Sequence, residues 1–389
     1  MISVDEARGR LFGAAHPLDC ESVPITEAAG RVLAEPVLAL RDQPPFAASA
    51  MDGYAVRASD LSNGPLKLVG EAAAGRRYDG LLGASEAVRI FTGAPLPSGA
   101  DAVLIQEDAT VVDGTVSTNE YVEAGAYVRP AALDFSAGAV LLEKNRRLEP
   151  RQVALAGAAG HGTVQVSRRP KVAFLATGDE LVAPGAQPGP DAIIASTTPA
   201  LAAMVTDAGA EAIDLGIVPD HQRTIAERAR EGFSRADVLV TLGGASVGDH
   251  DLVRPALKDI GVSLDFWKVA VKPGKPLMFA PSPLVLGLPG NPVSGIVCTL
   301  LFLIPLLEKM QGIADPGPHP ITGILGGPLP KNGPRRDHVR ARFQDGRLVP
   351  FGRQDSSMLA VLSQADALIV RMPGAPQANA GETVTYLAL

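Results

Sequence analysis

Apolar runs stop at glycine at three points between residues 171 and 292, and the polar residues that follow, several of them acidic, could hold a metal ion and a phosphate. The runs precede the segments TGDE (177–180), GGASVGDHD (243–251) and PGNP (289–292). Glycine lets the main chain approach a phosphate, and a helix N-terminus favours negative charge. Carboxylates near the same phosphate require a divalent cation between them. The pattern therefore predicts a combined metal and phosphate site.

Each acidic residue near these turns also has a purely structural explanation. Asp179 could cap the next turn, Asp220 could cap the helix that follows it, and one of Asp249 and Asp251 could cap the helix after the glycine-rich loop. Glu180 is less suited to capping, because caps favour shorter side chains. The carboxylate not used as a cap is a reasonable magnesium ligand. The residues Gly243, Gly244 and Ser246 of the same loop are candidates for binding the substrate.

Three lysines of the segment WKVAVKPGKP give the strongest anion-binding signal. Lys268 and Lys272 share one face of an expected strand because side chains alternate with a period of two, and Lys275 follows in a Pro-Gly turn. Lysines on edge strands often only prevent aggregation. This strand leads into the region of the acidic turns, which favours a functional role. A second basic cluster is interpreted as a solvated face and comprises Arg335, Arg336, Arg340 and Arg342.

The segment PGNPVSG predicts the start of a helix. Asn291 is suited to the N-cap and Pro292 to the first helical position. Ser294 would then lie in the first turn, where its hydroxyl and free N–H groups can face an anion. This helix chemistry is favourable whether or not a ligand binds.

Three further polar residues lie in glycine-containing turns outside this region. Asp52 belongs to SAMDGYAVR, Thr92 to IFTGAPLPSGAD and Asp134 to RPAALDFSAG. Turn formation alone explains such residues. Asp52 is the most unusual of them, because it is an acid far in sequence from the expected sheet.

The expected elements divide the chain into an α/β multidomain protein. The 389 residues allow roughly two to four domains. Strand and helix patterns alternate over 169–314, with a strand expected at 263–271, which predicts a mainly parallel sheet. A capping box at Ser3 and Glu6 predicts a first helix over about 4–15. We expect helical segments within 1–40 and 132–168, an inserted β domain at 41–131, and a small β-barrel at 315–389.

Composition excludes several classes of protein. Hydrophobic residues make up 46% of the chain and charged residues 20%, as in a soluble globular protein. The net charge of −7 argues against a general nucleic-acid or membrane-surface role. The chain has only two cysteines, Cys20 and Cys298, so a disulfide framework is not expected. No signal peptide is evident, and the apolar stretch 296–307 is too short to span a bilayer. These features predict a cytoplasmic protein.

Six motifs in order resemble the molybdopterin molybdenumtransferase family, which includes the C-terminal domain of gephyrin. They are SAMDGYAV, RIFTGAPLPSGAD, LATGDEL, LGGASVGDHD, FWKVAVKPGKP and GLPGNPVSG. The resemblance extends from the first helix to the C-terminus. It implies a homodimer of elongated four-domain subunits in which 169–314 is the molybdopterin-binding domain.

The resemblance also implies a reaction and a set of site residues. Molybdenum from molybdate would be inserted into adenylylated molybdopterin with release of AMP and assistance from Mg2+, held by Glu180 and Asp251. The implied polar set is Asp52, Thr92, Asp134, Glu180, Asp220, Asp251, Lys268 and Lys272, and the prolines Pro289 and Pro292 would shape the pocket. The implied anion-holding positions are Lys272, Lys275, Ser294, Arg336 and Ser356. The turn at Asp52 would complete the site of a partner subunit, and transient contacts with an upstream adenylyltransferase and with molybdoenzymes are expected.

Two positions depart from the family pattern, and two other functions stay open. Ala245 replaces the usual valine of the glycine loop, a mild packing change, and the segment Ala195-Ser196-Thr197 lacks the asparagine that often follows Ser or Thr. Adenylyltransfer to molybdopterin would use a related sheet domain, but it needs neither the β insertion nor the turn at Asp52. A non-catalytic scaffold is the third hypothesis, and the intact acidic set disfavours it.

Overall fold

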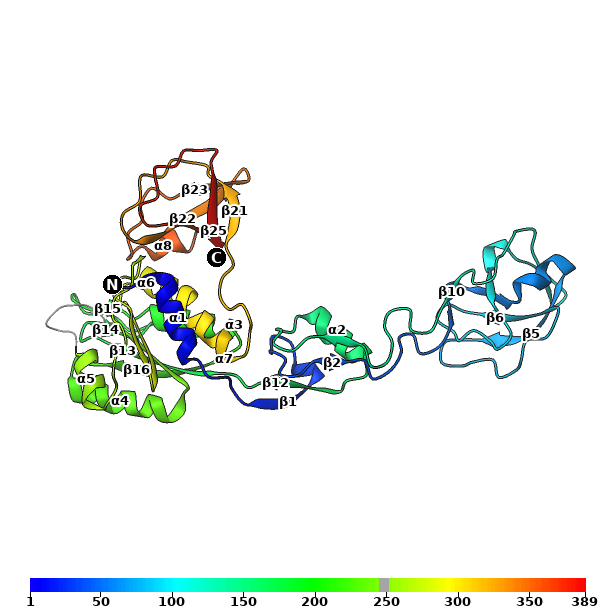
Figure 1. Cartoon of the computed structure of the whole chain (residues 1–389), viewed down its shortest axis with the longest axis horizontal. Helices are drawn as coiled ribbons and strands as arrows, with labels where there is room; N and C mark the ends of the chain where they lie inside the picture. The colour runs from blue at the N-terminus through cyan, green and yellow to red at the C-terminus, as the bar shows by residue number, and fades with distance from the viewer. Residues whose placement is uncertain (245–251) are drawn as a thin grey trace.

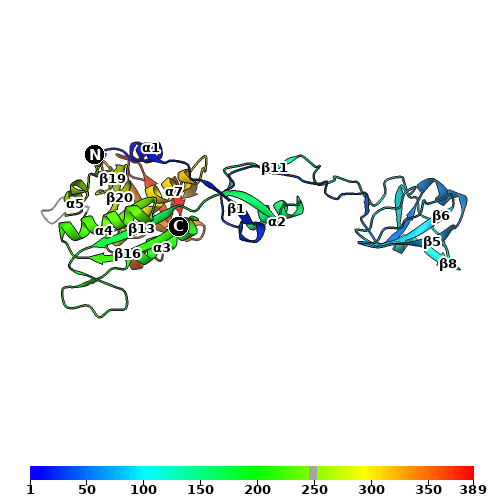
Figure 2. The same ribbon diagram turned by 90° about the horizontal axis from the view of Figure 1, so that it is seen from below.

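The chain forms an elongated molecule with folded units at both ends (Figure 1). The computed structural model describes residues 1–244 and 252–389. A unit built on a parallel sheet and the C-terminal unit lie at one end, and a smaller β unit lies at the other. A narrow stalk joins them, and the view from below shows the same linear arrangement (Figure 2).

A five-stranded sheet forms the centre of the first unit, in the order β16-β13-β17-β20-β19, with β19 antiparallel to β20. The strands are β13 (Lys171–Thr177), β16 (Glu211–Val218), β17 (Val238–Leu242), β19 (Met278–Pro281) and β20 (Leu284–Leu288). The helices are α3 (Thr197–Asp207), α4 (Gln222–Arg235), α5 (Val253–Asp259), α6 (Pro292–Cys298) and α7 (Ile304–Met310). The mainly parallel sheet predicted from the apolar runs is confirmed, because β17 and nearly all of β13 are buried on both faces.

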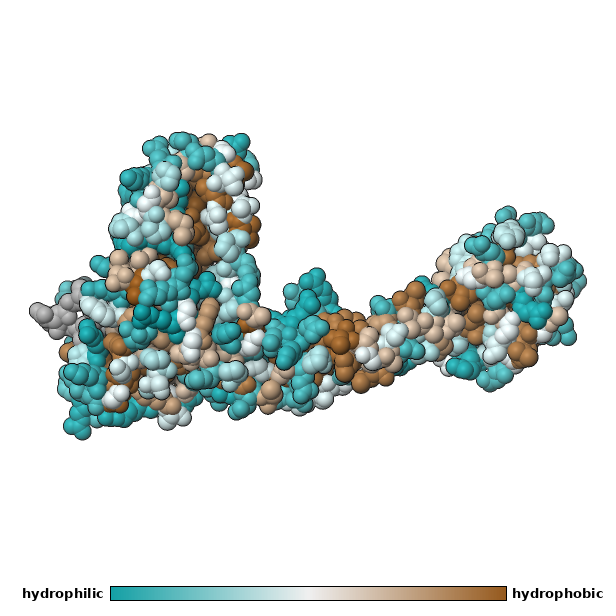
Figure 3. Space-filling model, in the orientation of Figure 1, coloured by the Kyte–Doolittle hydropathy of each residue, from teal (hydrophilic) through white to brown (hydrophobic). Residues whose placement is uncertain are grey.

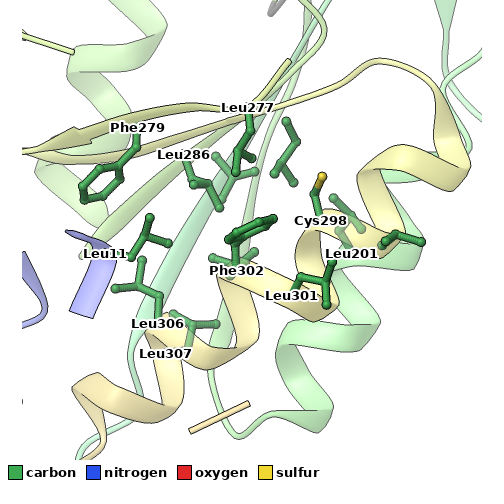
Figure 4. Close-up of a cluster of buried hydrophobic side chains, with 14 of the residues drawn as sticks. Leu11, Leu201, Leu277, Phe279, Leu286, Cys298, Leu301, Phe302, Leu306 and Leu307 are labelled. Carbon is green, nitrogen blue, oxygen red and sulfur yellow. The ribbon is translucent and has the colours of Figure 1, made fainter. Parts of the chain in front are cut away.

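One face of this sheet is covered by a long apolar helix (Figure 4). Phe302 and Leu306 of this helix pack against Phe279 and Leu286 of the sheet. Helix α6, a π-helical turn at Thr299–Leu303 and α7 together span Pro292–Met310, and this segment is long and apolar enough to cross a membrane. The prediction that the apolar stretch 296–307 is too short to span a bilayer is therefore wrong. Pro305 does not end the helical segment, because it lies in the first turn of α7, where proline is tolerated. In the most apolar part of this segment, 72% is buried inside the molecule. The segment is therefore apolar because it forms part of the core of the sheet unit.

Helix α1 (Val4–Ala14) packs on the sheet unit rather than on the stalk. Its buried residues Val4, Ala7 and Leu11 join the same apolar core. The Ser3 hydroxyl accepts a hydrogen bond from the Glu6 N–H at 3.0 Å, and the Glu6 carboxylate pairs with Arg10 at 2.7 Å. The sequence analysis placed this helix with the segments 1–40 and 132–168, which form the stalk. Its apolar residues are instead buried in the core of the sheet unit.

The strand predicted at 263–271 is not formed as expected. Only β18 (Val271–Lys272) is a strand here, and it pairs in parallel with β22 of the C-terminal unit. Lys268 lies outside any strand, and its carbonyl accepts a hydrogen bond from the Ile2 N–H. Lys268 and Lys272 therefore do not share one strand face. The segment leaves the parallel sheet to join another one.

The stalk contains less helix than predicted. It holds the short helix α2 (Pro150–Ala158) and the 3-10 turn η1 (Ile25–Glu27). The rest is two two-stranded sheets, β1 (Cys20–Pro24) with β12 (Thr163–Ser167) and β2 (Val37–Leu38) with β11 (Val140–Leu142). The proline expected near the start of α2 is at its first turn, and Glu149 with Gln152 forms a capping box there.

The inserted unit contains a six-stranded sheet in the order β7-β4-β6-β5-β9-β8. The strands are β4 (Gly53–Val56), β5 (Leu66–Ala72), β6 (Glu86–Ile90), β7 (Ala102–Ile105), β8 (Thr110–Val112) and β9 (Thr115–Ser117). The 3-10 turns η2 (Ala58–Asn63) and η3 (Gln106–Asp108) connect them. Strands β3 (Ala48–Ser49) and β10 (Val128–Arg129) pair where the chain enters and leaves this unit.

The C-terminal unit has the topology of a small barrel. Its strands are β21 (Ile321–Ile324), β22 (Arg336–Gln344), β23 (Arg347–Pro350), β24 (Ala367–Arg371) and β25 (Thr383–Ala388), with the short helix α8 (Leu359–Leu362). Strand β22 pairs with β23 and β24, and β25 pairs with β24 and β21. A parallel bridge between Leu325 and Leu348 brings the first and third strands together.

His338 of β22 makes the stability of this barrel depend on pH. Its side chain is buried, and this burial lowers the pKa of His338 from 6.5 to about 4. The unfolded chain takes up a proton near pH 6.5, but the folded chain takes it up only near pH 4. The free energy of unfolding should therefore fall as the pH drops through this window, by about 1.4 kcal/mol per pH unit. Urea unfolding at pH 7 and pH 5, followed by circular dichroism, should show a smaller fall in His338→Gln, and equal falls would contradict the assignment.

Candidate functional site

Three turns meet at the carboxyl edge of the parallel sheet. The main chain of Gly243, after β17, lies so close to Thr177 at the end of β13 that a Cβ on Gly243 would be 2.6 Å from the Thr177 carbonyl oxygen. A Cβ on Gly290, after β20, would be 3.6 Å from the Gly243 Cα. Pro289, Asn291 and Pro292 flank this turn and start α6. The predicted convergence of glycine turns is confirmed here. Of the glycine-rich loop, the residues Ala245, Ser246, Asp249 and Asp251 lie outside the described residues.

The turn at Gly243 should not tolerate a side chain. Gly243 has a φ of 89°, in the left-handed region, in addition to its close approach to Thr177. We expect Gly243→Ala to lower the free energy of unfolding by about 2–3 kcal/mol, combining left-handed strain with overpacking. Gly261→Ala is a matched control, because Gly261 has a φ of 82° but open space around its Cα. Denaturant unfolding followed by the fluorescence of Trp267, the only tryptophan of the chain, would measure both. Equal losses would show that the contact with Thr177 has no effect.

The described acids gather on two neighbouring turns of this edge. Asp179 Oδ1 accepts a hydrogen bond from the Asp220 N–H at 3.1 Å, which joins the turn after β13 to the turn after β16. The Glu180 carboxylate folds over Gly178, where a Cβ would lie 2.5 Å from Glu180 Oε2. Asp179 and Glu180 are exposed, and Asp220 is half-buried. Among residues 1–244 and 252–389, no group of three or more His, Cys, Asp and Glu side chains is arranged to hold a metal ion.

Thr177 is a candidate that the sequence did not single out. Its side chain is 3% exposed, and its Oγ1 has no hydrogen-bond partner within the described part of the chain. A Cβ on Gly244 would lie 3.4 Å from this oxygen. A buried hydroxyl without a partner is costly, so Thr177 is suited to bind a polar group at this edge. Thr177 is the first residue of the TGDE motif, but burial cannot be read from the motif. Thr197, at the start of α3, lies near the same edge, since a Cβ on Gly295 would be 3.0 Å from its Cγ2.

The basic residues gather beside this edge, between the sheet unit and the barrel. Strands β18 and β22 pair so that Val271 faces Arg336 and Lys272 faces Asp337. The turn at Gly274 packs on α6, where a Cβ would lie 3.8 Å from the Ser294 carbonyl oxygen. The main-chain carbonyl of Ser356 accepts a hydrogen bond from the Val293 N–H at 3.1 Å. The main chain thus runs close together near Lys272, Ser294, Arg336 and Ser356, with Lys275 directly after the turn at Gly274. Side chains alternate along a strand, so those of Lys272 and Arg336 lie on opposite faces of the β18–β22 pair.

The cations in this region differ in their partners. Lys272 Nζ donates to Asp337 Oδ2 at 2.6 Å, and Arg336 forms two hydrogen bonds of 2.5 and 3.0 Å with the Asp5 carboxylate. Lys268 Nζ lies 3.6 Å from the ring centre of Trp267. Hydrogen bonds from Arg336 lower the pKa of Asp5, and the positive charge of Arg336 lowers it further. Asp337 and Asp5 were not recognised in the sequence, because these pairs join residues 65 and 331 positions apart.

Arg340 corrects the interpretation of the arginine cluster as a solvated face. Its side chain is 2% exposed. It donates to Gln354 Oε1 and to the carbonyl oxygens of Asp355 and Met358 at 3.0–3.2 Å. These bonds fix the loop that carries Ser356 against β22.

Asp52, Thr92 and Asp134 lie far from this edge in the same chain. Asp52 Oδ1 accepts hydrogen bonds from the Thr92 N–H at 2.7 Å and from its hydroxyl at 2.8 Å, and these bonds lower the pKa of Asp52. The two residues lie in turns next to β4 and β6 of the distant β unit (Figure 1). Asp134 lies where the stalk reaches that unit, and its N–H donates to the Gln43 carbonyl. The predicted site residues therefore form two separate groups in the chain. One lies at the sheet edge and beside it, and the other, with Asp52, Thr92 and Asp134, lies in or near the distant β unit.

Comparisons with known proteins cover nearly the whole chain. Residues 2–160 match the MoeA N-terminal region (domain I and II), 173–309 a probable molybdopterin binding domain, and 322–389 the MoeA C-terminal region (domain IV). The molybdopterin molybdenumtransferase of Nostoc sp. is 36% identical, covering 100% of this chain and 94% of that protein. The Haemophilus influenzae molybdopterin molybdenumtransferase is 34% identical, covering 99% and 98%. The crystal structure of a molybdopterin biosynthesis moeA protein from Pyrococcus horikoshii OT3 is 27% identical and superposes over 100% of both chains with a TM-score of 0.88. The chain belongs to the molybdopterin molybdenumtransferase family, transferases of molybdenum cofactor biosynthesis.

Proposed function

We propose that this protein inserts molybdenum from molybdate into adenylylated molybdopterin and releases AMP in a magnesium-dependent reaction. The observation that supports this most strongly is the convergence of two chemically different groups of residues. Glycine turns with Thr177, Glu180 and Asp220 lie at the sheet edge, and the cations of β18 and β22 lie beside α6. The first group suits a phosphoanhydride and the second suits an oxyanion.

The residues of the chain would bind and orient the two substrates rather than attack them. The glycine turns would let main-chain N–H groups approach the phosphates, and the Thr177 hydroxyl would gain the partner that it lacks. Lys268, Lys272, Lys275 and the first turn of α6 would hold molybdate next to the dithiolene. Fixed charges and donors of this kind can carry such a step without a protein nucleophile.

Magnesium fits the donors at this edge chemically. Mg2+ commonly binds one or two carboxylates and completes its shell with water and substrate phosphates, so a three-carboxylate cluster is not required. Glu180 and Asp251 would hold the ion, which would offset charge on the phosphoanhydride.

We further propose that the protein acts as a homodimer in which the turn of Asp52 and Thr92 completes the site of the partner. Exposed apolar side chains on the stalk support this, namely Leu38, Leu40, Leu133 and Val140. Figure 3 shows apolar surface along the stalk, where a second copy could cover it. The proposal also includes a cytoplasmic location and transient contacts with an upstream adenylyltransferase and with molybdoenzymes. It assigns no role to nucleic acid or to a membrane.

A release assay tests the proposed reaction. The full chain is incubated with adenylylated molybdopterin and Mg2+, with and without molybdate, and AMP is measured. We expect AMP release to require both molybdate and Mg2+. Release that ignores molybdate would overturn the insertion step, and formation of adenylylated molybdopterin from molybdopterin and ATP would favour the adenylyltransfer alternative.

A further inference from the structure

Ala270, in the lysine segment WKVAVKPGKP, is the point at which two distant parts of the chain meet this segment. Its N–H donates to the Ile2 carbonyl at 2.8 Å, and its carbonyl accepts a hydrogen bond from the Arg336 N–H at 2.9 Å. The Arg336 side chain in turn binds the carboxylate of Asp5, which lies three residues after Ile2. The Asp5–Arg336 pair therefore closes a ring of contacts through the N-terminus, the lysine segment and the barrel.

Arg336 lies on the face of β22 that is turned towards α1. It is the cross-strand neighbour of Val271, which is fully buried in the same core as Val4 of α1. Its guanidinium forms two hydrogen bonds with Asp5, and its side chain is 18% exposed. Lys272 lies on the other face of the β18–β22 pair, because side chains alternate along a strand. The two cations therefore point away from each other, which argues against a shared oxyanion.

Helix α1 contacts the barrel side of the molecule at a second point. Arg8, one turn after Asp5, donates to the Pro316 carbonyl at 2.7 Å, in the connection between α7 and β21. The helix itself is fixed, because its apolar residues are buried in the core of the sheet unit. Helix α1 therefore connects the barrel to that core.

The position of Lys272 depends on these contacts. Strand β18 has only two residues, fewer than strands usually have, and it pairs with β22. Strand β22 belongs to the barrel, which follows the sheet unit in the chain through the single connection after α7. A shift of the barrel would therefore move β22, and with it Lys272. The Asp5–Arg336 pair limits that shift, because it connects β22 to α1.

We propose that Asp5 and Arg336 are positioning residues, which fix β22 on α1 and thereby hold the lysine segment where Lys272 binds the oxyanion. Neither side chain touches the oxyanion itself. This inference rests on the proposed binding of an oxyanion at Lys272.

The variant Asp5→Asn separates this role from direct binding by Arg336. If Arg336 bound the oxyanion, loss of the Asp5 charge would free its guanidinium and remove a repulsive carboxylate, so binding would tighten. If the pair positions the lysine segment, the same substitution loosens that segment and binding weakens. The sign of the change decides between the two roles.

Calorimetric titrations of the full chain with molybdate, and separately with AMP and Mg2+, measure the effect. Because the Asp5 side chain is 72% exposed and exposed pairs contribute little, the dissociation constant for molybdate should rise about three- to fivefold in Asp5→Asn and in Arg336→Met. The double variant should bind molybdate no more weakly than the weaker single variant, and the affinity for AMP should stay the same. Tighter molybdate binding in Asp5→Asn, losses that add in the double variant, or an equal loss of AMP affinity would overturn the proposal.

Two further variants of α1 control for charge and for the carboxylate itself. Glu6→Gln removes the same charge one residue further along, but Glu6 pairs with Arg10 and not with the barrel. It should bind molybdate as wild type does, and weakening there would point to a general effect of α1. Asp5→Glu keeps the carboxylate and should also bind as wild type does, so binding as weak as that of Asp5→Asn would contradict the positioning role.

Hydrogen–deuterium exchange measures the effect of the pair without any anion. The amides of Ala270 and Arg336 donate within the ring of contacts and should exchange faster in Asp5→Asn than in wild type. The amides of β17, in the centre of the parallel sheet, should not change. Unchanged exchange at Ala270 and Arg336 would overturn the proposal even in a protein that binds molybdate. Wild-type protein that binds no molybdate, with faster exchange in the variant, would instead overturn the proposed oxyanion site, and the positioning role with it.

Discussion

Replacing Lys272 by glutamine is expected to lower kcat/KM for molybdate-dependent AMP release by about 100- to 1,000-fold. The substitution removes a charged donor aimed at the oxyanion, and losing one such preorganised donor typically costs this much. It also leaves the partly buried carboxylate of Asp337 without its partner. Steady-state assays at varied molybdate would measure the effect, and thermal melting would show whether the variant is folded.

Lys331→Gln is the matched control for that substitution. Lys331 is exposed and lies in the C-terminal unit, with which the strand of Lys272 pairs, so the variant loses the same charge without touching the proposed site. A loss in Lys331→Gln similar to that in Lys272→Gln would show that overall charge, and not the position of Lys272, controls the rate.

Asp52→Asn is expected to lower the insertion rate by about 1,000-fold while leaving the fold intact. The Asp52 side chain is half-buried and bonds only to Thr92 within the described part of the chain, and both bonds end on the same oxygen, so the amide oxygen of asparagine can keep them while the negative charge is lost. The expected loss is comparable to that of other electrostatic groups at reaction centres. Single-turnover AMP release and circular dichroism would measure rate and fold.

Mixing two inactive variants tests whether Asp52 acts in the partner's site. Asp52→Asn and Lys272→Gln subunits should regain part of the activity when they exchange, because one of the two sites in a mixed dimer then has both residues intact. Mixtures that stay inactive after subunit exchange has been demonstrated would contradict action across the dimer. Size-exclusion chromatography with light scattering would establish the dimer independently.

The sequence predicts the sheet edge well because local patterns determine it. Apolar runs that end at glycine define the strands β13, β17 and β20, and Asp179 and Glu180 follow β13 directly. Parallel strands expose their carboxyl ends on one edge, so local order is enough to bring these residues together. The helix starting at Pro292 follows from the same kind of local signal.

The anion side is predicted less well because distant pairings determine it. The lysine segment reads as a strand of the parallel sheet, but Val271 and Lys272 pair with a strand from the C-terminal unit. Periodicity gives no information on which sheet a short strand joins. The carboxylates of Asp5 and Asp337 and the burial of Arg340 depend on the same pairing, so the sequence alone does not identify them.

The pairing of β18 with β22 also constrains how this architecture can vary during evolution. Lys272 and its carboxylate partner Asp337 are encoded in separate parts of the gene, but they lie on adjacent strands. A recombination event that exchanged the C-terminal barrel alone would separate them and leave β18 as an unpaired edge. The two segments must therefore be inherited together, and substitutions in one should be accompanied by substitutions in the other.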